Sequence, residues 1–309
     1  MPHKLPYHEY LHTKLARHAE RILKRLYPED PARREAFLNA IIAQEARMPA
    51  IYWMEQPPAE RPFQTKRVAD WQPDWVDVLT QIEVDAPSHH QLYFDGAFYS
   101  LDFSSVAEAS ALLAIKEPVN TILDVCSAPG GKGIFAYRLF KPETLICNEV
   151  IYKRHASLKS NLERCHVPAE IIQMDPKQLP GRYDQQCNLV QVDAPCSGQS
   201  LVARGLEASG AFQDHMINAN MSRQRRILAE SAPCVTIGGH LAYSTCTYGR
   251  EENEKNVEWF LRTFPEFKAT EAPHLDRHRS TLTDPACYRF EPQEGVGAGG
   301  FVALFQRTA

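Results

Sequence analysis

The sequence predicts an α/β protein, in which residues 101–309 form a mixed, mostly parallel sheet of seven strands and residues 1–100 form a smaller, mainly helical domain. Two observations predict this class. Beyond residue 120, short β-rich runs alternate with stretches of helical spacing, which is typical of a parallel sheet with helical crossovers. Before that point, apolar residues recur at helical spacing. The composition, 44% hydrophobic and 23% charged, excludes a disordered or collagen-like chain.

The N-terminal region is predicted to hold two helices, at residues 11–26 and 31–47, and a basic surface. Residues 1–34 carry eight basic and four acidic residues, a net charge of +4, which leaves −8 on the rest of a chain whose total is −4. The apolar stripe of the first helix consists of Leu11, Leu15, Ala19, Ile22 and Leu26, and its basic residues are Lys14, Arg17, Arg21, Lys24 and Arg25. The basic side is either a solvated helix face or a surface that contacts RNA phosphates.

The remaining elements follow in order along the chain. A Pro-rich stretch, residues 49–73, is expected to be a loop, and residues 104–115 a helix that begins close to the domain boundary near residue 100. The expected strands are residues 121–126, 144–150, 171–175, 188–193, 240–245, 288–290 and 300–305. The expected helices between them are residues 134–140, 154–164 and 221–235.

The loop after the first of these strands predicts a cofactor site. It reads Ser127-Ala-Pro-Gly-Gly-Lys132, and its two glycines permit a tight turn and a close backbone approach where a helix begins. The loop is neither a Walker loop nor a G-x-G-x-x-G fingerprint. Glu149 ends the second strand, where α/β folds hold ribose hydroxyls, and Asp175 ends the third, where it can face an adenine. These features favour S-adenosylmethionine over NAD.

Two cysteines are predicted to share the cleft with that cofactor. Cys196 follows the fourth strand in Asp193-Ala-Pro-Cys-Ser-Gly198, and Cys246 follows the fifth in Ser244-Thr-Cys-Thr247. The carboxyl ends of neighbouring parallel strands meet in one crevice. The other six cysteines are interpreted as small buried hydrophobes, and without a C-x-x-C spacing we expect no metal site. Free thiols and the lack of a hydrophobic signal core predict a cytoplasmic protein, and no apolar run reaches the roughly 20 residues of a membrane span.

The ordered motifs resemble those of the NOL/NOP/Sun family of RNA (cytosine-5) methyltransferases over residues 90–309. The matching segments are residues 123–132, 193–198, 243–247 and Glu251-Glu-Asn-Glu254. The resemblance implies a Rossmann-like class I methyltransferase that uses S-adenosylmethionine to form 5-methylcytosine in ribosomal or transfer RNA. It also implies a monomer without a metal, with specificity supplied in some cases by a protein partner. Residues 199–210 depart from the family's usual acid and Trp after Gly198.

The family resemblance also assigns roles to the site residues. Carbon 5 of cytosine is a poor nucleophile, and a thiolate that adds to carbon 6 makes the ring enamine-like and activates carbon 5. Cys246 would supply this thiolate, Cys196 would assist release of the product, Asp193 would bind the cytosine edge, and Lys132 would lie near the reacting centre. The expected cofactor-binding residues are Cys126, Ser127, Ala128, Pro129, Gly130, Gly131, Lys132, Glu149, Asp175 and Asp193.

Three alternatives stay open at this stage. Cys196 could be the attacking thiol, as in DNA cytosine methyltransferases, although their partner motif is not Ser-Thr-Cys. The chain could be a catalytically weak RNA-binding or ribosome-assembly factor of the same fold. It could also methylate a protein or a small molecule, a reaction in which paired cysteines have no obvious use.

Overall fold

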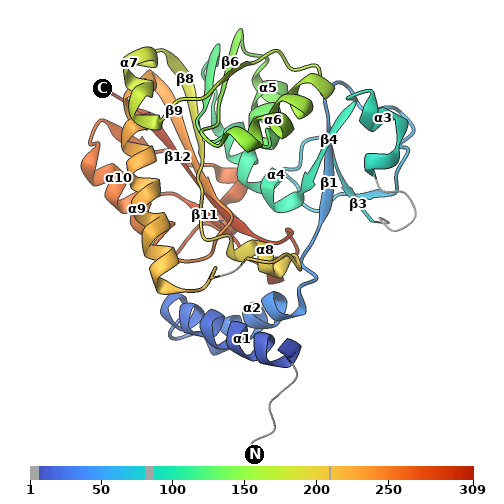
Figure 1. The fold of residues 1–309 in the computed structure, drawn as a ribbon, viewed down its shortest axis with the longest axis vertical. Helices are drawn as coiled ribbons and strands as arrows, with labels where there is room; N and C mark the ends of the chain where they lie inside the picture. The colour runs from blue at the N-terminus through green and yellow to red at the C-terminus, as the bar shows by residue number, and fades with distance from the viewer. Residues whose placement is uncertain (1–6, 81–86, 209) are drawn as a thin grey trace, which may run out of the picture.

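A computed structural model describes residues 7–80, 87–208 and 210–309, with the side chains of residues 7–14 outside the description. Its larger sheet has the strand order β10-β12-β9-β8-β5-β6-β7, with β11 paired to β12 (Figure 1). The strands are β5 (Thr121–Asp124), β6 (Thr144–Asn148), β7 (Glu170–Ile172), β8 (Cys187–Asp193), β9 (Val235–Thr245), β10 (Phe267–Ala269), β11 (Tyr288–Phe290) and β12 (Gly300–Arg307). Strands β5 to β9 pair in parallel, whereas β12 runs antiparallel to β9, β10 and β11. The predicted mixed, mostly parallel sheet is confirmed, with β10 as a strand that the sequence did not predict.

Helices cover both faces of this sheet, as an α/β fold requires. Ile122 belongs to the apolar cluster under α4 and α5, whereas its neighbour Leu123 belongs to the cluster under α9 and α10, because successive strand side chains point to opposite faces. The helices of this part are α4 (Phe103–Ala109), α5 (Gly131–Phe140), α6 (Tyr152–Arg164), α7 (Leu179–Tyr183), α8 (Gln199–Ala203), α9 (Asp214–Ser231) and α10 (Glu254–Thr263). Short 3₁₀ turns are η2 (Ser110–Ala114), η3 (Pro176–Gln178), η4 (Ala232–Cys234), η5 (Pro273–His278) and η6 (Pro292–Glu294).

The strand order places the functional loops together. From the central strand β5, the chain proceeds to β6 and β7 on one side and later to β8 and β9 on the other. The loops after β5, β6, β8 and β9 therefore leave the same edge of the sheet around this reversal, which is where open α/β sheets bind ligands.

The N-terminal region contains the two predicted helices and also a small antiparallel sheet that the sequence analysis missed. The helices are α1 (Tyr7–Leu26) and α2 (Pro31–Ala43), followed by η1 (Pro87–His89) and α3 (Gln91–Phe94). The sheet has the order β2-β3-β1-β4, with β1 (Pro49–Trp53), β2 (Thr65–Lys66), β3 (Val76–Leu79) and β4 (Phe98–Asp102). The expectation of a loop over residues 49–73 was therefore wrong for β1 and β2. All five residues of β1 are buried, so it lacks the alternation that marks an exposed strand, and its proline stands at the first position, where a strand tolerates it.

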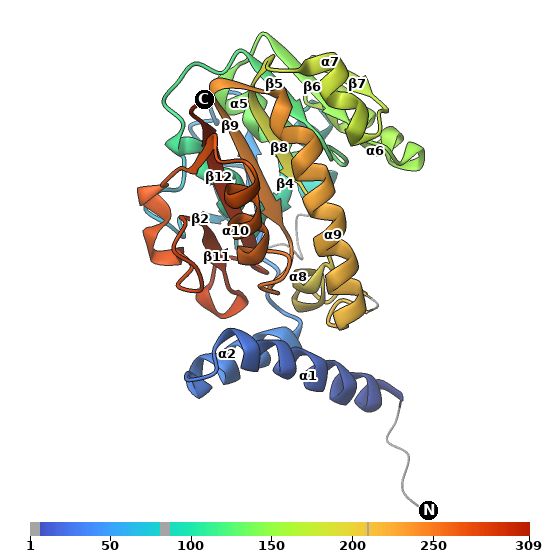
Figure 2. The ribbon, with the colours of Figure 1, turned by 90° about the vertical axis from the view of Figure 1, so that its left-hand side faces the viewer.

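The apolar stripe of α1 packs as predicted, and part of its basic side is engaged with the rest of the protein. Ala19, Ile22 and Leu26 are buried against α2 and residues near α8 and α9. Figures 1 and 2 show α1 and α2 below the ends of α8 and α9. Arg21 and Arg25 lie 3.3 and 3.0 Å from the carboxylate of Asp214, the first residue of α9. Lys24 pairs with Glu20 one turn away. The side chains of Leu11 and Lys14 lie outside the described residues. No described helix has the length and apolar character needed to cross a membrane.

Residue 100, near which a domain boundary was expected, lies in β4, just before α4, and the division into two domains stays a prediction. The two regions nevertheless share one apolar core, in which Tyr52 and Val78 of the small sheet join Phe103 and Ile134 of the larger part. The hydroxyl of Tyr52 donates to the carbonyl of Gly131, 2.7 Å away, at the first turn of α5. The N-terminal sheet thus packs directly behind the cofactor loop.

Candidate active site

A pocket of about 1150 Å³ opens at the carboxyl edge of the parallel strands. Its walls come from the loops after β5, β6, β7, β8 and β9, from α4, and from α8 and α9. Pockets that bury one drug-sized ligand usually measure 300–1,000 Å³. This pocket is therefore large enough for a nucleoside cofactor together with part of a second substrate.

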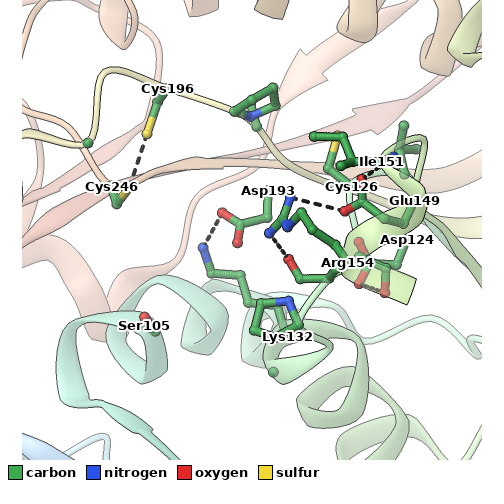
Figure 3. Close-up of a pocket in the computed structure, with 18 of the residues that line it drawn as sticks. Ser105, Asp124, Cys126, Lys132, Glu149, Ile151, Arg154, Asp193, Cys196 and Cys246 are labelled. Atoms are coloured by element: carbon green, nitrogen blue, oxygen red, sulfur yellow. Dashed lines mark hydrogen bonds and ion pairs between the residues drawn. The ribbon is translucent and has the colours of Figure 1, made fainter. Parts of the chain in front are cut away.

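Cys196 and Cys246 meet inside this pocket (Figure 3). Their sulfur atoms lie 3.0 Å apart, within hydrogen-bond distance for thiols. Either sulfur can be the donor of this hydrogen bond; the contact lowers the pKa of Cys246 and, together with burial, raises the pKa of Cys196. Because a thiolate is the nucleophilic form, the two sulfurs of this pair differ in their readiness to ionise.

A buried lysine connects three polar side chains on the opposite wall of the pocket. Nζ of Lys132 donates to Oδ1 of Asp193 at 2.5 Å and to Oγ of Ser244 at 2.9 Å, and it lies within hydrogen-bond distance of the carboxyl group of Glu108. Burial alone would lower the pKa of Lys132, but Asp193 and Glu108 outweigh it and raise this pKa. Burial raises the pKa of Glu108 to about 8, against the opposing effect of Lys132. Lys132 is therefore a fixed ammonium that orients Asp193 toward the pocket.

Polar side chains behind the two cysteine loops fix their positions. Glu252 is fully buried, and its Oε2 accepts hydrogen bonds from the backbone N–H of Ser197 and from Nε2 of Gln224, at 2.9 and 2.8 Å. Burial raises the pKa of Glu252 to about 6. The hydroxyls of Ser197 and Thr247 lie 2.7 Å apart and join the two loops directly. The Glu251–Glu254 motif therefore supports the cysteine pair from behind.

The other end of the pocket has the features of a cofactor site. Gly130, the N-cap of α5, has φ = 108°, a conformation that favours glycine. Glu149, just past β6, is buried, accepts a hydrogen bond from the N–H of Ile151 at 2.8 Å, and lies 3.0 Å from Nη1 of Arg154. Figure 3 shows Glu149 at the far side of Asp193 and Lys132 from the cysteine pair. A buried carboxylate beside a glycine turn fits the ribose end of a nucleoside.

The structure brings every residue of the predicted site to this pocket except Gly130, which sits in the turn just behind its wall. The predicted residues that line the pocket are Cys126, Ser127, Ala128, Pro129, Gly131, Lys132, Glu149, Asp175, Asp193, Cys196 and Cys246. The expectation that Asp175 closes the third strand was wrong, because β7 ends at Ile172. Asp175 instead begins η3, where its carboxylate accepts from the N–H of Lys177 and completes a capping box.

Sequence reasoning missed Glu108 and did not single out Asp124. Glu108 is a lone acid in a helix of small and apolar residues, and this was the signal that could have revealed it. Asp124 ends β5 and accepts a hydrogen bond from Ser127 at 2.9 Å. Burial raises its pKa to about 7. Of the six remaining cysteines, Cys126 lines the pocket and five are buried as expected. The described residues contain no group of side chains that could hold a metal ion.

The fold and this site define a Rossmann-like methyltransferase, and comparison with known proteins specifies its family. Residues 111–306 match the family described as 16S rRNA methyltransferase RsmB/F, and the chain belongs to that family. This confirms the resemblance to NOL/NOP/Sun methyltransferases. The chain is 30% identical over 222 residues to ribosomal RNA small subunit methyltransferase F of Pectobacterium carotovorum, and 30% identical over 221 residues to the protein of that name in Vibrio parahaemolyticus. Each match covers 70% of this chain and 46% of the relative, so the chain spans about half the length of the curated relatives it matches.

Solved structures share the whole fold at low sequence identity. A methyltransferase homologue from Pyrococcus horikoshii superposes with a TM-score of 0.76 at 20% identity, over 95% of this chain and 99% of its own. The structure of NSun6 from the same organism, solved with SFG, has a TM-score of 0.69 at 18% identity, over 94% and 98% of the two chains. These matches confirm the fold, including the N-terminal region.

Proposed function

We propose that this protein is an S-adenosylmethionine-dependent RNA methyltransferase that forms 5-methylcytosine, with Cys246 as the nucleophile. The observation that carries the proposal is the pair of cysteine sulfurs, 3.0 Å apart, in one pocket with the Lys132–Asp193 ion pair. A methyltransferase that acts directly on an oxygen or nitrogen needs no thiol pair. Addition of a thiolate to a pyrimidine ring, followed by its elimination, has a use for both sulfurs.

The residues present fit S-adenosylmethionine. Glu149 and Asp175 line the pocket beyond the glycine turn, where they would hold the ribose and the adenine, and Cys126 to Lys132 would surround the methionine portion. When bound, this cofactor supplies the methyl group. A P. horikoshii relative of the same fold was solved with SFG, an analogue of S-adenosylmethionine, which supports this choice.

The chain's own residues account for the steps at the base. The Cys246 thiolate adds to carbon 6 of cytosine, and negative charge develops toward ring nitrogen 3. Asp193 binds this edge of the base, and Lys132 orients Asp193 and supplies positive charge beside it. After methylation, a solvent water takes the carbon 5 proton, the electron pair of that C–H bond re-forms the 5,6 double bond, and the Cys246–carbon 6 bond breaks to release the Cys246 thiolate. Cys196, 3.0 Å from the departing sulfur, assists this elimination by donating its hydrogen bond to the returning thiolate.

Ribosomal RNA is the acceptor that the family favours. The family description names 16S rRNA, and the relatives are named ribosomal RNA small subunit methyltransferases. The helix carrying Lys14, Arg17, Arg21, Lys24 and Arg25 was predicted to help dock this RNA, and that role stays a prediction. The rival interpretation, a catalytically weak assembly factor, requires the same fold but no turnover.

The test is transfer of a tritiated methyl group from the cofactor to RNA extracted from cells that lack this protein. Digestion to nucleosides should place the label in 5-methylcytosine, and separation of ribosomal from transfer RNA should place it in ribosomal RNA. Cofactor binding without labelled RNA would instead support the assembly factor, and label in protein would refute an RNA substrate.

Two cysteine variants test the assigned roles. Cys246→Ala should abolish turnover. Cys196→Ala should accumulate a covalent RNA adduct that survives a denaturing gel. Cys234→Ala, at a buried cysteine that does not line the pocket, is the control and should retain turnover. An adduct trapped by Cys246→Ala would reverse the assignment and make Cys196 the nucleophile.

A further inference from the structure

One wall of the pocket carries arginines that the proposed chemistry does not use. Arg204 follows α8, and Arg223 and Arg226 lie on α9, and all three line the pocket that contains Cys246. Arg223 and Arg226 are exposed, and within the described part of the chain neither side chain takes part in a hydrogen bond or ion pair. Two acidic residues of the pocket lining, Asp102 and Glu207, lie near Arg204 in space or in sequence, so three positive charges stand against two negative ones.

The Nε side of the Arg204 guanidinium faces a buried carboxylate, whereas its terminal nitrogens have no hydrogen-bond acceptor among the described residues. Its Nε is buried without a hydrogen bond and lies 3.9 Å from Oδ2 of Asp102. Asp102 is almost fully buried, and its carboxylate already accepts from the backbone N–H groups of Met48, Ser104 and Ala298. The fixed carboxylate therefore attracts the guanidinium by charge, while no described group accepts from its terminal nitrogens.

The backbone that carries Arg204 is fixed to its surroundings. The N–H of Ala46 donates to the carbonyl of Ala203 at 2.9 Å, which ties the end of α8 to the N-terminal region. Gln199, fully buried, donates to the carbonyl of Ala211 and accepts from the N–H groups of Tyr248 and Gly249. This wall therefore keeps its position relative to Cys246, two residues before Tyr248. The backbone that carries Arg204 is therefore already in place before an anion binds.

We infer that Arg204, Arg223 and Arg226 form a clamp that binds the phosphates of the RNA strand on either side of the target cytosine. The inference rests on the proposed function, since it assumes that the pocket admits a nucleotide. A base that enters the pocket brings its two flanking phosphates to the pocket mouth. Exposed guanidinium groups bind phosphate oxygens through paired hydrogen bonds. The segment 199–210, where the chain departs from the family's usual residues, thereby acquires a role in substrate binding.

The experiment measures equilibrium binding of a fluorescent 12-nucleotide single-stranded RNA with one central cytosine at several salt concentrations. Each lost phosphate contact should lower the slope of log affinity against log salt by about 0.7 for a single strand. Arg223→Ala/Arg226→Ala should therefore reduce the slope by about 1.4, and Arg204→Ala by about 0.7. Arg204→Lys should keep the slope, because it keeps the charge, and weaken binding several-fold.

The matched control is Arg262→Ala/Arg277→Ala, which removes the same charge from two exposed arginines outside the pocket lining. Thermal unfolding of each variant verifies that it is folded. The inference is refuted if the slope of log affinity against log salt is the same in Arg223→Ala/Arg226→Ala as in this control. It is also overturned if the unchanged protein does not bind the RNA at low salt, because phosphate contacts do not depend on sequence.

The RNA-binding assay and the methyl-transfer assay test separate claims, and either claim can be refuted without the other. If Arg223→Ala/Arg226→Ala shows the expected reduced salt slope but the unchanged protein does not methylate cytosine, the proposed function is refuted and the arginines remain an RNA-binding site. Methylation of cytosine with an unaltered salt slope in Arg223→Ala/Arg226→Ala would refute the clamp and leave the proposed function.

Discussion

Replacing Cys196 with Ala should raise the pKa of Cys246, because it removes the hydrogen bond that stabilises the Cys246 thiolate. A hydrogen bond to a charged group contributes about 1.5–3 kcal/mol. A thiol is a weak donor, so the lower end applies. Since 1.36 kcal/mol corresponds to one pKa unit, the expected rise is about one unit. Cys196→Ser restores a donor and should return the pKa of Cys246 most of the way to its original value.

The assay is alkylation by iodoacetamide across a pH series, with the Cys246 peptide quantified by mass spectrometry. The midpoint of the pH profile is the measured quantity rather than the rate at one pH. A thiolate of higher pKa is intrinsically more nucleophilic, and this partly compensates for its lower abundance. A midpoint that stays constant or falls in Cys196→Ala would show that the hydrogen bond runs from Cys246 to Cys196. The assignment of the nucleophile would then be reversed.

Three further predictions concern the same pocket. The pKa of Glu108 is raised from 4.5 to about 8, so between these pH values the folded protein retains a proton that the unfolded chain has lost. The free energy of unfolding should therefore fall as pH rises through this window, by about 5 kcal/mol at most. Glu108→Gln should make this free energy, measured by urea unfolding, less dependent on pH. The same pH dependence in both proteins would refute the prediction. A Cβ at Gly300 would lie 1.8 Å from Oε1 of Glu108, so Gly300→Ala should destabilise the protein by about 1–3 kcal/mol, and an unchanged melting temperature would contradict the packing. Hydrogen peroxide should oxidise Cys196 and Cys246 to a disulfide, with two waters formed, and dithiothreitol should restore both thiols and activity; loss of activity that dithiothreitol cannot reverse would exclude the pair as the oxidised group.

The parallel part of the fold was predictable because each strand is a short apolar run followed by a turn. β5, β6 and β8 are such runs, and the predicted helices at residues 134–140 and 154–164 correspond to α5 and α6, which follow the first two. The small N-terminal sheet was not predictable in this way. Strand β1 is buried along its whole length and β2 has only two residues, so neither shows the alternation of a half-exposed strand.

The chemical groups of the site were predictable from strand ends, whereas their supports were not. Cys196 and Cys246 follow neighbouring strands, and topology alone brings the ends of such strands together. Glu108 comes from α4, which is distant in sequence from Lys132 and approaches it only through tertiary packing. Arg204 lies in a segment without a recognisable motif, and its relation to Asp102 depends on the whole fold.

The basic face of α1 and the arginine wall of the pocket differ in what a mutation can test. Arg21 and Arg25 pair with Asp214, so their removal weakens the attachment of α1 to α9 as well as lowering positive charge. α1 and α2 in turn cover Tyr248, which lies two residues beyond Cys246 and packs edge-on against Phe37 with ring centroids 4.8 Å apart. Loss of RNA affinity after changes in α1 would therefore combine electrostatic and structural effects. The exposed arginines of α9 have no such structural partner within the described residues, so a change in salt slope there reports on RNA contacts directly.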